Sequence, residues 1–574
     1  MWPTASWGGA VRSGVVGFLC IALIQPPVAA VQTSAPIQAD IGSEEQRFRQ
    51  QGKPEQPRLV TPPEIEDRTV PPPEEPSAAS TRTVSVKTIQ VEGTALVPRD
   101  RLRRLIAPYE GRDVSLADLG RLTTELTQWL RSHGYVTSRA YLPPQEVTQG
   151  VVTIQVLEGR VGTIQVEGAR YSRPQALTAR MKTRPGEPLE YRTLQQDLTR
   201  LNASPDRRVA AVLFPGTATG ATDVTLRVED ELPFHVSYLM HNGGTKFTGR
   251  FRQGIQIAHG NVTGRDDQFV TRAEFSERSD FVGVSSSYLL PLGPSGRTLG
   301  WEISHARVVL GRQFRQNDIT GNATVLGFTW TEPVWQAERW NAEWATGYDW
   351  VRVRSRELGS DRGKDDLRVL RIGPTLSEHD ATGRSVLSTE VGIGFSGLLG
   401  ASHKVDPAAS RSGTGGQFAR LAMAGGRLQR LPAGTRLLLR GSWQATNDRL
   451  PPTEGVRLGG EDTVRGYPEG EILGDHGYSG TAELQYPIPV TLPFSDRPTR
   501  STLTLVGFVD GGAAFSRKPL VGEESKKRLI GLGLGCRWTL SRSANVLVDV
   551  GWPVGDDSSE GSSPQVYYRA VIGF

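Results

Sequence analysis

The sequence is poor in cysteine and has no long apolar run beyond its first 30 residues. Its 574 residues contain two cysteines, Cys20 and Cys536. Because Cys20 lies in a predicted signal peptide, we expect no disulfide in the mature chain. Nothing after residue 30 approaches 18 consecutive apolar residues, and hydrophobic residues make up only 37% of the chain. These shortages exclude a disulfide-stapled domain and a membrane protein that crosses the bilayer with helices.

Motifs for catalysis and for metal or cofactor binding are also missing. The eight histidines are scattered without the spacing of metal ligands. The sequence has no Gly-x-Ser-x-Gly elbow and no Walker phosphate loop. Gly531, Gly533 and Gly535 alternate within a strand-like run without a helix after them. We therefore expect them to thin one face of a strand, that is, to leave this face without side chains. We therefore expect no enzyme activity, no metal and no cofactor, and the net charge of +5 is too small to indicate nucleic acid.

The N-terminal segments predict export followed by a linker. Residues 1–30 carry Arg12, an apolar run and Val28-Ala29-Ala30, which is the pattern of a signal peptide. Residues 31–82 contain nine prolines, a density that predicts an extended linker without helix or sheet. Within it, residues 43–51 begin with the spacing of a helix capping box, so we expect either a short helix or a disordered tail there.

Residues 83–159 and 160–230 each carry an α+β pattern. The first pattern has strand-like residues at 84–91, helices at 98–106 and after Ser115, and strands at 136–142 and 151–157. The second has a strand from 161, helices at 174–181 and 192–202, and strands at 209–214 and 223–228. The sequence Ile-Gln-Val-Glu-Gly occurs at both 89–93 and 164–168, a repeat with a period of about 75 residues. We expect two related modules.

Residues 231–574 alternate apolar and polar side chains. Around residue 272, for example, Ala273 and Phe275 alternate with Arg272 and Glu274. This period, together with tryptophans in or near many strand-like runs, predicts a transmembrane antiparallel β-barrel with lipid outside and water inside. At about 10 residues per strand plus turns, the segment accommodates about 16 strands. We expect Arg272, Glu274 and Arg440 to line a polar lumen.

One long glycine-rich stretch, residues 457–486, lies between strand-like runs of this barrel. It contains Val464, Arg465, Gly466 and Tyr467 in sequence and mixes aromatic residues with charges of both signs. That composition predicts a loop that packs against another surface, with an ordinary polar hairpin loop as the alternative. A second short motif, Phe-Val-Asp-Gly-Gly at 508–512, follows on a later strand.

These two motifs resemble the signature pair of the two-partner secretion transporters, the haemolysin secretion/activation family, and the α+β modules resemble its POTRA domains. The resemblance implies that the loop folds back into the barrel. It also implies that Arg465 meets Asp510 on the inner wall, beside Phe508 and Gly512. Residues 43–51 would then be the candidate for a helix that plugs the pore.

The resemblance further implies a function. We expect a translocator in the outer membrane of a Gram-negative bacterium, with its POTRA-like modules in the periplasm. It would bind an unfolded secreted exoprotein, such as an adhesin, cytolysin or toxin, and export it through the barrel without ATP. We expect a monomer embedded in outer-membrane lipid, without nucleic acid. The alternative function is assembly or insertion of other outer-membrane proteins.

The predicted pair of Arg465 and Asp510 leads to a hypothesis about the loop. A bidentate pair inside a partly desolvated lumen would fix the loop inward, so we interpret the pair as a latch between resting and conducting positions. On this hypothesis, exchanging the two residues restores the secretion that each single substitution abolishes.

Overall fold

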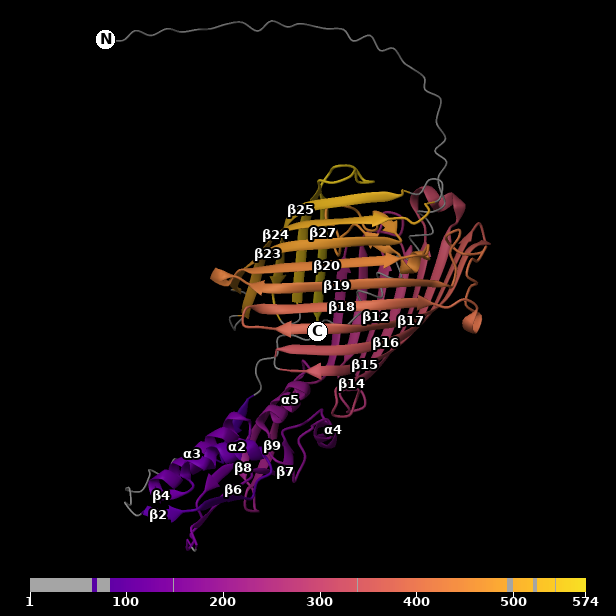
Figure 1. Ribbon diagram of the computed structural model, residues 1–574. Helices are drawn as coiled ribbons and strands as arrows, with labels where there is room; N and C mark the ends of the chain where they lie inside the picture. Colours follow the sequence, from indigo (N-terminus) through magenta and orange to yellow (C-terminus); the bar gives the residue numbers. More distant parts are fainter. Residues whose placement is uncertain are drawn as a thin grey trace, which may run out of the picture.

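The computed structural model describes residues 64–69, 83–147, 149–337, 339–492, 499–519, 524–541 and 544–574. Figure 1 shows a large β-barrel and, beyond one of its ends, two smaller α+β units in succession. The predicted signal peptide and the helix expected over residues 43–51 lie outside the described residues. Among the residues described, no helix has both the length and the apolar character needed to cross a bilayer.

The first unit packs two helices on short strands. Its elements are β2 (Thr83–Val86), β3 (Thr88–Glu92), α2 (Arg99–Ile106), β4 (Arg112–Ser115), α3 (Leu116–Ser132), β5 (Arg139–Tyr141) and β6 (Val151–Leu157). The predicted helix after Ser115 is confirmed, because the Ser115 side chain accepts a hydrogen bond from the Asp118 N–H and forms a capping box. The strand-like residues 84–91 form two strands that separate at Lys87, because β2 pairs with β4 whereas β3 pairs with β6.

The second unit is a four-stranded sheet covered by two helices. Its elements are β7 (Arg160–Glu167), α4 (Pro174–Ala179), α5 (Tyr191–Leu201), β8 (Arg207–Pro215) and β9 (Ala221–Asp230), with the strand order β1-β8-β9-β7. Strand β1 (Ile65–Asp67) comes from the proline-rich linker and runs parallel to β8. The prediction that the linker excludes sheet is therefore wrong for residues 65–67. The reason is that Glu64 to Val70 is free of proline and has its backbone groups available for pairing.

A buried ion pair fixes the second unit to the barrel. Asp266, in the turn that follows barrel strand β11 (Arg252–His259), receives the guanidinium groups of Arg207 and Arg180, with Arg207 Nη2 donating to Asp266 Oδ2 at 2.7 Å. Burial lowers the pKa of Arg207 to about 10, so the group stays protonated at neutral pH. Asn261 of the same turn donates to the Tyr171 carbonyl at 2.9 Å. The second unit is thus held against the mouth of the barrel.

Sixteen of the remaining strands close into an antiparallel barrel, as predicted. They are β10 (Phe234–His241), β11 (Arg252–His259), β12 (Gln268–Ser276), β13 (Phe281–Leu292), β14 (Arg297–Val309), β15 (Thr320–Gln336), β16 (Trp340–Glu357), β17 (Ser360–His379), β18 (Gly383–Gly394), β19 (Phe418–Arg430), β20 (Arg436–Thr446), β23 (His476–Leu492), β24 (Thr499–Phe515), β25 (Lys526–Thr539), β26 (Ala544–Pro553) and β27 (Gln565–Gly573). Each strand pairs with its neighbours in order, and β27 returns to β10 with Tyr238 opposite Ile572.

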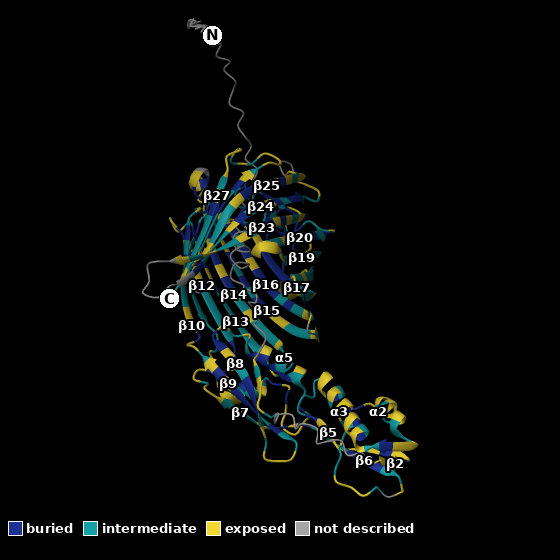
Figure 2. Ribbon diagram, turned by 90° about the vertical axis from the view of Figure 1, so that its left-hand side faces the viewer, coloured by how far each residue is buried: buried dark blue, intermediate teal, exposed yellow. Residues whose placement is uncertain are grey.

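The two faces of the barrel wall differ as the alternation predicts. On β12, Arg272 and Glu274 are buried toward the interior, whereas Ala273 and Phe275 are exposed on the outside. In Figure 2, buried, intermediate and exposed residues follow one another along the same strands of the barrel. The third residue expected in the lumen, Arg440, lies on the face of β20 opposite to the outward Leu439.

Candidate functional site in the barrel lumen

The segment between β20 and β23, which we call the lumen loop (residues 447–475), packs against the inner wall of the barrel. It contains a short hairpin of β21 (Val456–Leu458) and β22 (Ile472–Gly474). Its apolar residues form a buried cluster with two wall residues: Leu458, Val464, Tyr467 and Ile472 of the loop with Ala514 of β24 and Leu529 of β25. The loop is therefore ordered by apolar burial as well as by charge, as its mixed composition predicts.

Arg465 lies at the centre of the contact between loop and wall, and its side chain is 1% exposed. Its Nε donates to Asp510 Oδ2 at 2.7 Å and its Nη2 to Asp510 Oδ1 at 3.0 Å, which is the bidentate geometry. The backbone N–H of Arg465 donates to the same carboxylate at 3.1 Å. The guanidinium carbon also lies 3.4 Å from the centroid of the Phe508 ring. The structure thus brings Arg465 together with the Asp510 and Phe508 of the second motif.

Arg465 has more acidic partners than the sequence motif indicates. Its Nη1 donates to Glu483 of β23 and to Asp549 of β26, both at 2.9 Å. Arg537 of β25 also contacts Asp549 and Glu483. We call these five residues the Arg465 anchor: Arg465, Glu483, Asp510, Arg537 and Asp549. A simple Arg–Asp latch is therefore an incomplete description, because three carboxylates share the guanidinium group.

Gly466 and Tyr467 fix the backbone of the loop beside Arg465. Gly466 has φ of +101°, and a Cβ there would lie 2.7 Å from the carbonyl carbon of Trp552, so only glycine fits. The Tyr567 hydroxyl accepts from the Gly466 N–H at 2.9 Å and donates to the Tyr467 carbonyl at 2.6 Å. The Tyr467 hydroxyl donates to the Asp556 carbonyl at 2.9 Å. The backbone at Gly466 and Tyr467 is thus held by hydrogen bonds that do not involve charged side chains.

Glycines on the inner face of the wall make room for this part of the loop. A Cβ on Gly551 would lie 2.6 Å from the Gly466 nitrogen, and one on Gly531 would overlap the carbonyl oxygen of Arg465. Gly512 of the second motif likewise faces the loop, since its Cβ would lie 3.1 Å from Cδ1 of Leu458. The prediction that alternating glycines thin one face of β25 is confirmed at Gly531, where the thinned face accommodates the loop.

A second set of charges binds the loop to another part of the wall, and sequence reasoning missed it. Glu454, 2% exposed, accepts from Arg371 Nη2 of β17 at 2.7 Å and from Arg420 Nε of β19 at 2.8 Å. Arg371 also donates to Asp349 of β16 at 2.6 Å, and Arg420 to Glu390 of β18 at 2.7 Å. We call Glu454, Asp349, Arg371, Glu390 and Arg420 the Glu454 anchor. One sequence signal could have found these wall residues: they are charged and lie in strands whose apolar and polar residues alternate.

The end of the loop is also tied down, in this case to other connections between strands. Asp475 is fully buried and accepts from Arg411 Nη1 at 2.7 Å. It accepts as well from the backbone N–H of Arg517 at 2.6 Å and, within the lumen loop itself, from that of Leu450 at 2.8 Å. The loop is therefore held at its start, its centre and its end.

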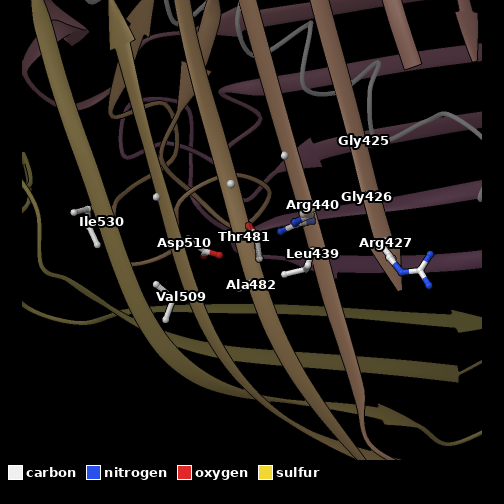
Figure 3. A pocket seen from close by; sticks show the side chains of 13 residues that line it. Gly425, Gly426, Arg427, Leu439, Arg440, Thr481, Ala482, Val509, Asp510 and Ile530 are labelled. Atoms are coloured by element: carbon white, nitrogen blue, oxygen red, sulfur yellow. The ribbon is translucent and has the colours of Figure 1, made fainter. Parts of the chain in front are cut away.

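The outer face of the wall behind Asp510 carries a row of four glycines. Gly425, Gly441, Gly480 and Gly511 are neighbours on four successive strands. Beside them lies a shallow hollow of about 580 Å³ that Leu439, Val509 and Ile530 help to line (Figure 3). Asp510 follows Val509 on β24 and points to the other face of the wall, where it meets Arg465. The wall is thus thin where it carries the Arg465 anchor.

The barrel with its inward loop and α+β modules matches known proteins. Residues 220–538, more than half of the chain, match the family described as haemolysin secretion/activation protein ShlB/FhaC/HecB. The chain belongs to this family. Residues 84–159, the first unit, match the POTRA domain of ShlB type. Like the family, this ShlB/FhaC/HecB-type chain is an outer-membrane β-barrel transporter of Gram-negative bacteria with a periplasmic POTRA domain.

Individual relatives cover most of the transporter. Outer membrane transporter CdiB of Dickeya dadantii (strain 3937) is 26% identical over 480 residues, which cover 80% of this chain and 81% of that protein. Hemolysin transporter protein HpmB of Proteus mirabilis is 24% identical over 415 residues, covering 70% and 72% of the two chains. Among solved structures, CdiB from Escherichia coli superposes with a TM-score of 0.73 at 22% identity, over 94% of this chain and 98% of that one. The last match shows that the fold is shared.

Proposed function

We propose that this transporter exports an unfolded secreted protein, which its periplasmic modules bind and its barrel conducts without ATP. The observation that carries the proposal is the lumen loop, which two charged anchors hold against the inner wall of a closed barrel. A loop inside the lumen lies where an extended chain has to cross. Its displacement would therefore open the path.

The anchors suit a loop that has to move. Ion pairs and hydrogen bonds can exchange their partners for water once the lumen hydrates, whereas the 16 hydrogen-bonded strand pairs of the wall stay intact. Inward residues such as Arg272 and Glu274, which pair with each other, make the inner wall polar, so it presents little apolar surface to an unfolded chain. In this proposal the free energy for export comes from folding of the client outside the cell.

The proposal gives the periplasmic modules the task of capturing the client. Their sheets have edge strands, among them β3 and β7, to which an extended chain can add by backbone hydrogen bonds without strict sequence selection. The transporter would act as a monomer in outer-membrane lipid. Its clients would be adhesins, cytolysins or toxins.

Insertion of other barrels is the second candidate function, and one feature favours it. The seam between β10 and β27 has five paired positions, against 18 between β16 and β17. A short seam is the place where a barrel would open sideways for another strand. However, Asn242 extends the seam by donating to the Val566 carbonyl at 2.6 Å, and Phe574 by donating to the Val236 carbonyl at 2.8 Å. Family membership supports export over insertion.

The experiment is an export assay in Escherichia coli. The transporter is co-expressed with a candidate client, a long secreted protein encoded in the same genome, and the client is measured in the medium and in the periplasm. Export predicts that the client appears outside only when the transporter is present. A client that stays in the periplasm, together with a changed level of other outer-membrane barrels, would favour the insertion function instead.

A further inference from the structure

The outward face of β16 changes from aromatic to basic along its length. Its outward residues include, in chain order, Trp340, Trp344, Tyr348, Trp350, Arg352, Arg354 and Arg356. They alternate with inward residues such as Asp349, which binds Arg371 in the lumen. The stretch from Trp340 to Trp350 has the length of about 9–11 residues that a tilted strand needs to cross a bilayer, with an aromatic residue for the interface at each end. The arginines after Trp350 therefore lie at the level of lipid headgroups.

This end of β16 faces the outside of the cell. Strand β10 begins soon after β9 of the second module, and neighbouring strands of the barrel are antiparallel. Strands β10, β12, β14 and β16 therefore all run away from the modules. Because the POTRA domain is periplasmic, the end of β16 lies in the outer leaflet of the membrane.

Cations line up across neighbouring strands at this level. Arg307 of β14, Asn322 of β15, Arg354 of β16 and Lys364 of β17 are paired in register. The row covers three strand spacings, about 14 Å. On β13 the residue opposite Arg307 is Val282, so the row ends there. We define the basic face by five residues: Arg307, Arg352, Arg354, Lys364 and Asp366.

One carboxylate positions three of these cations without neutralising the face. Asp366 accepts from Arg352 Nε at 3.0 Å and from Arg354 Nη2 at 3.1 Å, and Lys364 Nζ lies 3.1 Å from its Oδ2. Its side chain is 5% exposed, whereas those of Arg352 and Lys364 are nearly half exposed. Arg307 is exposed and has no acidic partner among the residues that the structure describes. Four cations and one carboxylate give a formal charge of +3, and N–H donors remain for a ligand.

The position of the basic face selects a lipid as its ligand. The face points away from the lumen, where an exported chain would pass. The guanidinium carbon of Arg352 lies 5.1 Å from the centroid of the Trp350 ring, at the upper edge of the apolar band. An anion bound here thus has apolar surface directly below it, and an anionic lipid fills both places at once.

We propose that the basic face binds the phosphorylated glycolipid of the outer leaflet. Its phosphates lie on the row from Arg307 to Lys364, and its acyl chains lie on the apolar band below Trp350. A guanidinium group suits phosphate because two of its N–H donors match two phosphate oxygens. A disaccharide headgroup with a phosphate at each end reaches both ends of the row. The inference depends on the location in the outer membrane and not on the export function.

A bound glycolipid would join the strands that hold the lumen loop. The row crosses β16 and β17 on the outside of the wall. The same two strands carry Asp349 and Arg371 of the Glu454 anchor on the inside. The lipid would therefore brace this part of the wall from outside.

Binding of purified lipids tests the chemistry of the site. The full transporter in detergent is titrated with fluorescent lipid A that carries both phosphates, with lipid A from which the phosphates have been removed, and with phosphatidylglycerol. We expect the first lipid to bind at least about tenfold more tightly than either of the others, because only its headgroup has a phosphate at each end. Equal binding of phosphatidylglycerol would show a general attraction of cations to anionic lipids and would overturn the proposal.

Variants test which residues bind the lipid. Arg307→Gln with Arg354→Gln should weaken binding of bisphosphorylated lipid A at least about tenfold, and lysine at both positions should restore part of the affinity. The matched control, Arg297→Gln with Arg339→Gln, removes two exposed cations at the periplasmic end of the barrel and should change binding by less than about twofold. An equal loss in both glutamine variants, or no loss in either, contradicts the site. Arg307→Gln alone breaks no ion pair, so it decides the question, with a loss of at least about threefold, if the double variant does not fold.

Photocrosslinking tests the site in growing cells. A benzophenone residue in place of Asn322 lies within the row, and one in place of Val391 of β18 is exposed on the same outer surface, beside the apolar band. We expect light to attach lipopolysaccharide at position 322, and the yield there to fall at least about fivefold when Arg307→Gln and Arg354→Gln are added. The yield of lipid adducts at position 391 should stay unchanged. A yield at 322 that does not respond to the two substitutions would show only that the residue faces the outer leaflet, and the basic face would then not be a binding site.

Discussion

The lumen loop is held at two parts of the barrel wall, and the two anchors have the same composition with opposite polarity. Each contains two arginines and three carboxylates. At the Arg465 anchor, strands β23 to β26 supply the three carboxylates and the loop supplies a guanidinium group. At the Glu454 anchor, strands β16 to β19 supply both arginines and the loop supplies a carboxylate.

This difference decides which net charge remains on each part of the wall when the loop leaves. Without the loop, the first wall keeps three carboxylates and the guanidinium of Arg537, a formal charge of −2. The second wall keeps two arginines with Asp349 and Glu390, a formal charge of zero. Like charges in a partly desolvated wall repel, whereas Arg371 and Arg420 can stay paired within their own wall. We therefore expect the Glu454 anchor to release the loop more readily than the Arg465 anchor.

Exchange of the central pair should have the largest effect. Arg465→Asp with Asp510→Arg places a carboxylate toward Glu483 and Asp549, so the swap adds repulsion where a simple pair would be restored. We expect export to be lost as completely as in either single variant, in contrast to the rescue that the sequence motif alone predicts. The measurement is client in the medium, with transporter abundance in the outer membrane as the control. Recovery of export would show that Asp510 alone determines the role of Arg465.

Removal of the loop cation alone should be less damaging but still severe. Arg465→Gln leaves three buried carboxylates beside Arg537. We expect the barrel to lose about 3 kcal/mol of stability, the low end for a broken buried ion pair, because lumen water can hydrate the freed carboxylates. Urea unfolding of the purified transporter measures this loss, and planar-bilayer conductance should rise as the loop is released. An unchanged conductance would contradict an anchoring role.

The glycine face of β25 offers an uncharged way to weaken the same anchor. Gly531→Ala directs a methyl group into the carbonyl oxygen of Arg465, so the loop has to shift away from the wall at a cost of roughly 1–3 kcal/mol. Gly511→Ala is the matched control, since its Cβ would meet nothing closer than the Leu529 carbonyl at 3.9 Å, on the lipid face of the wall. Conductance should increase for Gly531→Ala and stay unchanged for Gly511→Ala. Equal behaviour of the two variants would show that the fit of the loop to β25 does not hold it inside.

The barrel and the central part of the site could be predicted because their signals are local or repeated. Alternation such as that around Arg272 recurs along many strands, and it follows from lipid on one side and water on the other. The contact of Arg465 with Asp510 came from the resemblance to a family. Neither signal depends on knowing which strands are neighbours.

The missed features depend on pairing between distant strands. Glu454 meets Arg371 and Arg420 only because strands β17 and β19 place both arginines toward the loop, and an inward arginine looks the same in sequence whether or not it has a partner. Strand β1 was missed because the surrounding prolines dominate the local composition, whereas its pairing partner β8 lies about 145 residues later in the chain.

Neutralising the second anchor should have the smallest effect, and this tests the comparison most directly. Glu454→Gln keeps a hydrogen-bond acceptor for Arg371 and Arg420, and both arginines retain Asp349 or Glu390, so we expect a loss of about 1 kcal/mol. The control is Glu332→Gln, which removes an exposed ion pair with Arg297 on the barrel surface and should change stability by less than about 0.5 kcal/mol. Conductance should rise for Glu454→Gln, though by less than for Arg465→Gln, because the loop is freed near its start while the Arg465 anchor still holds its centre. If Glu454→Gln releases the loop as fully as Arg465→Gln does, the polarity of the two anchors does not set which anchor is released first.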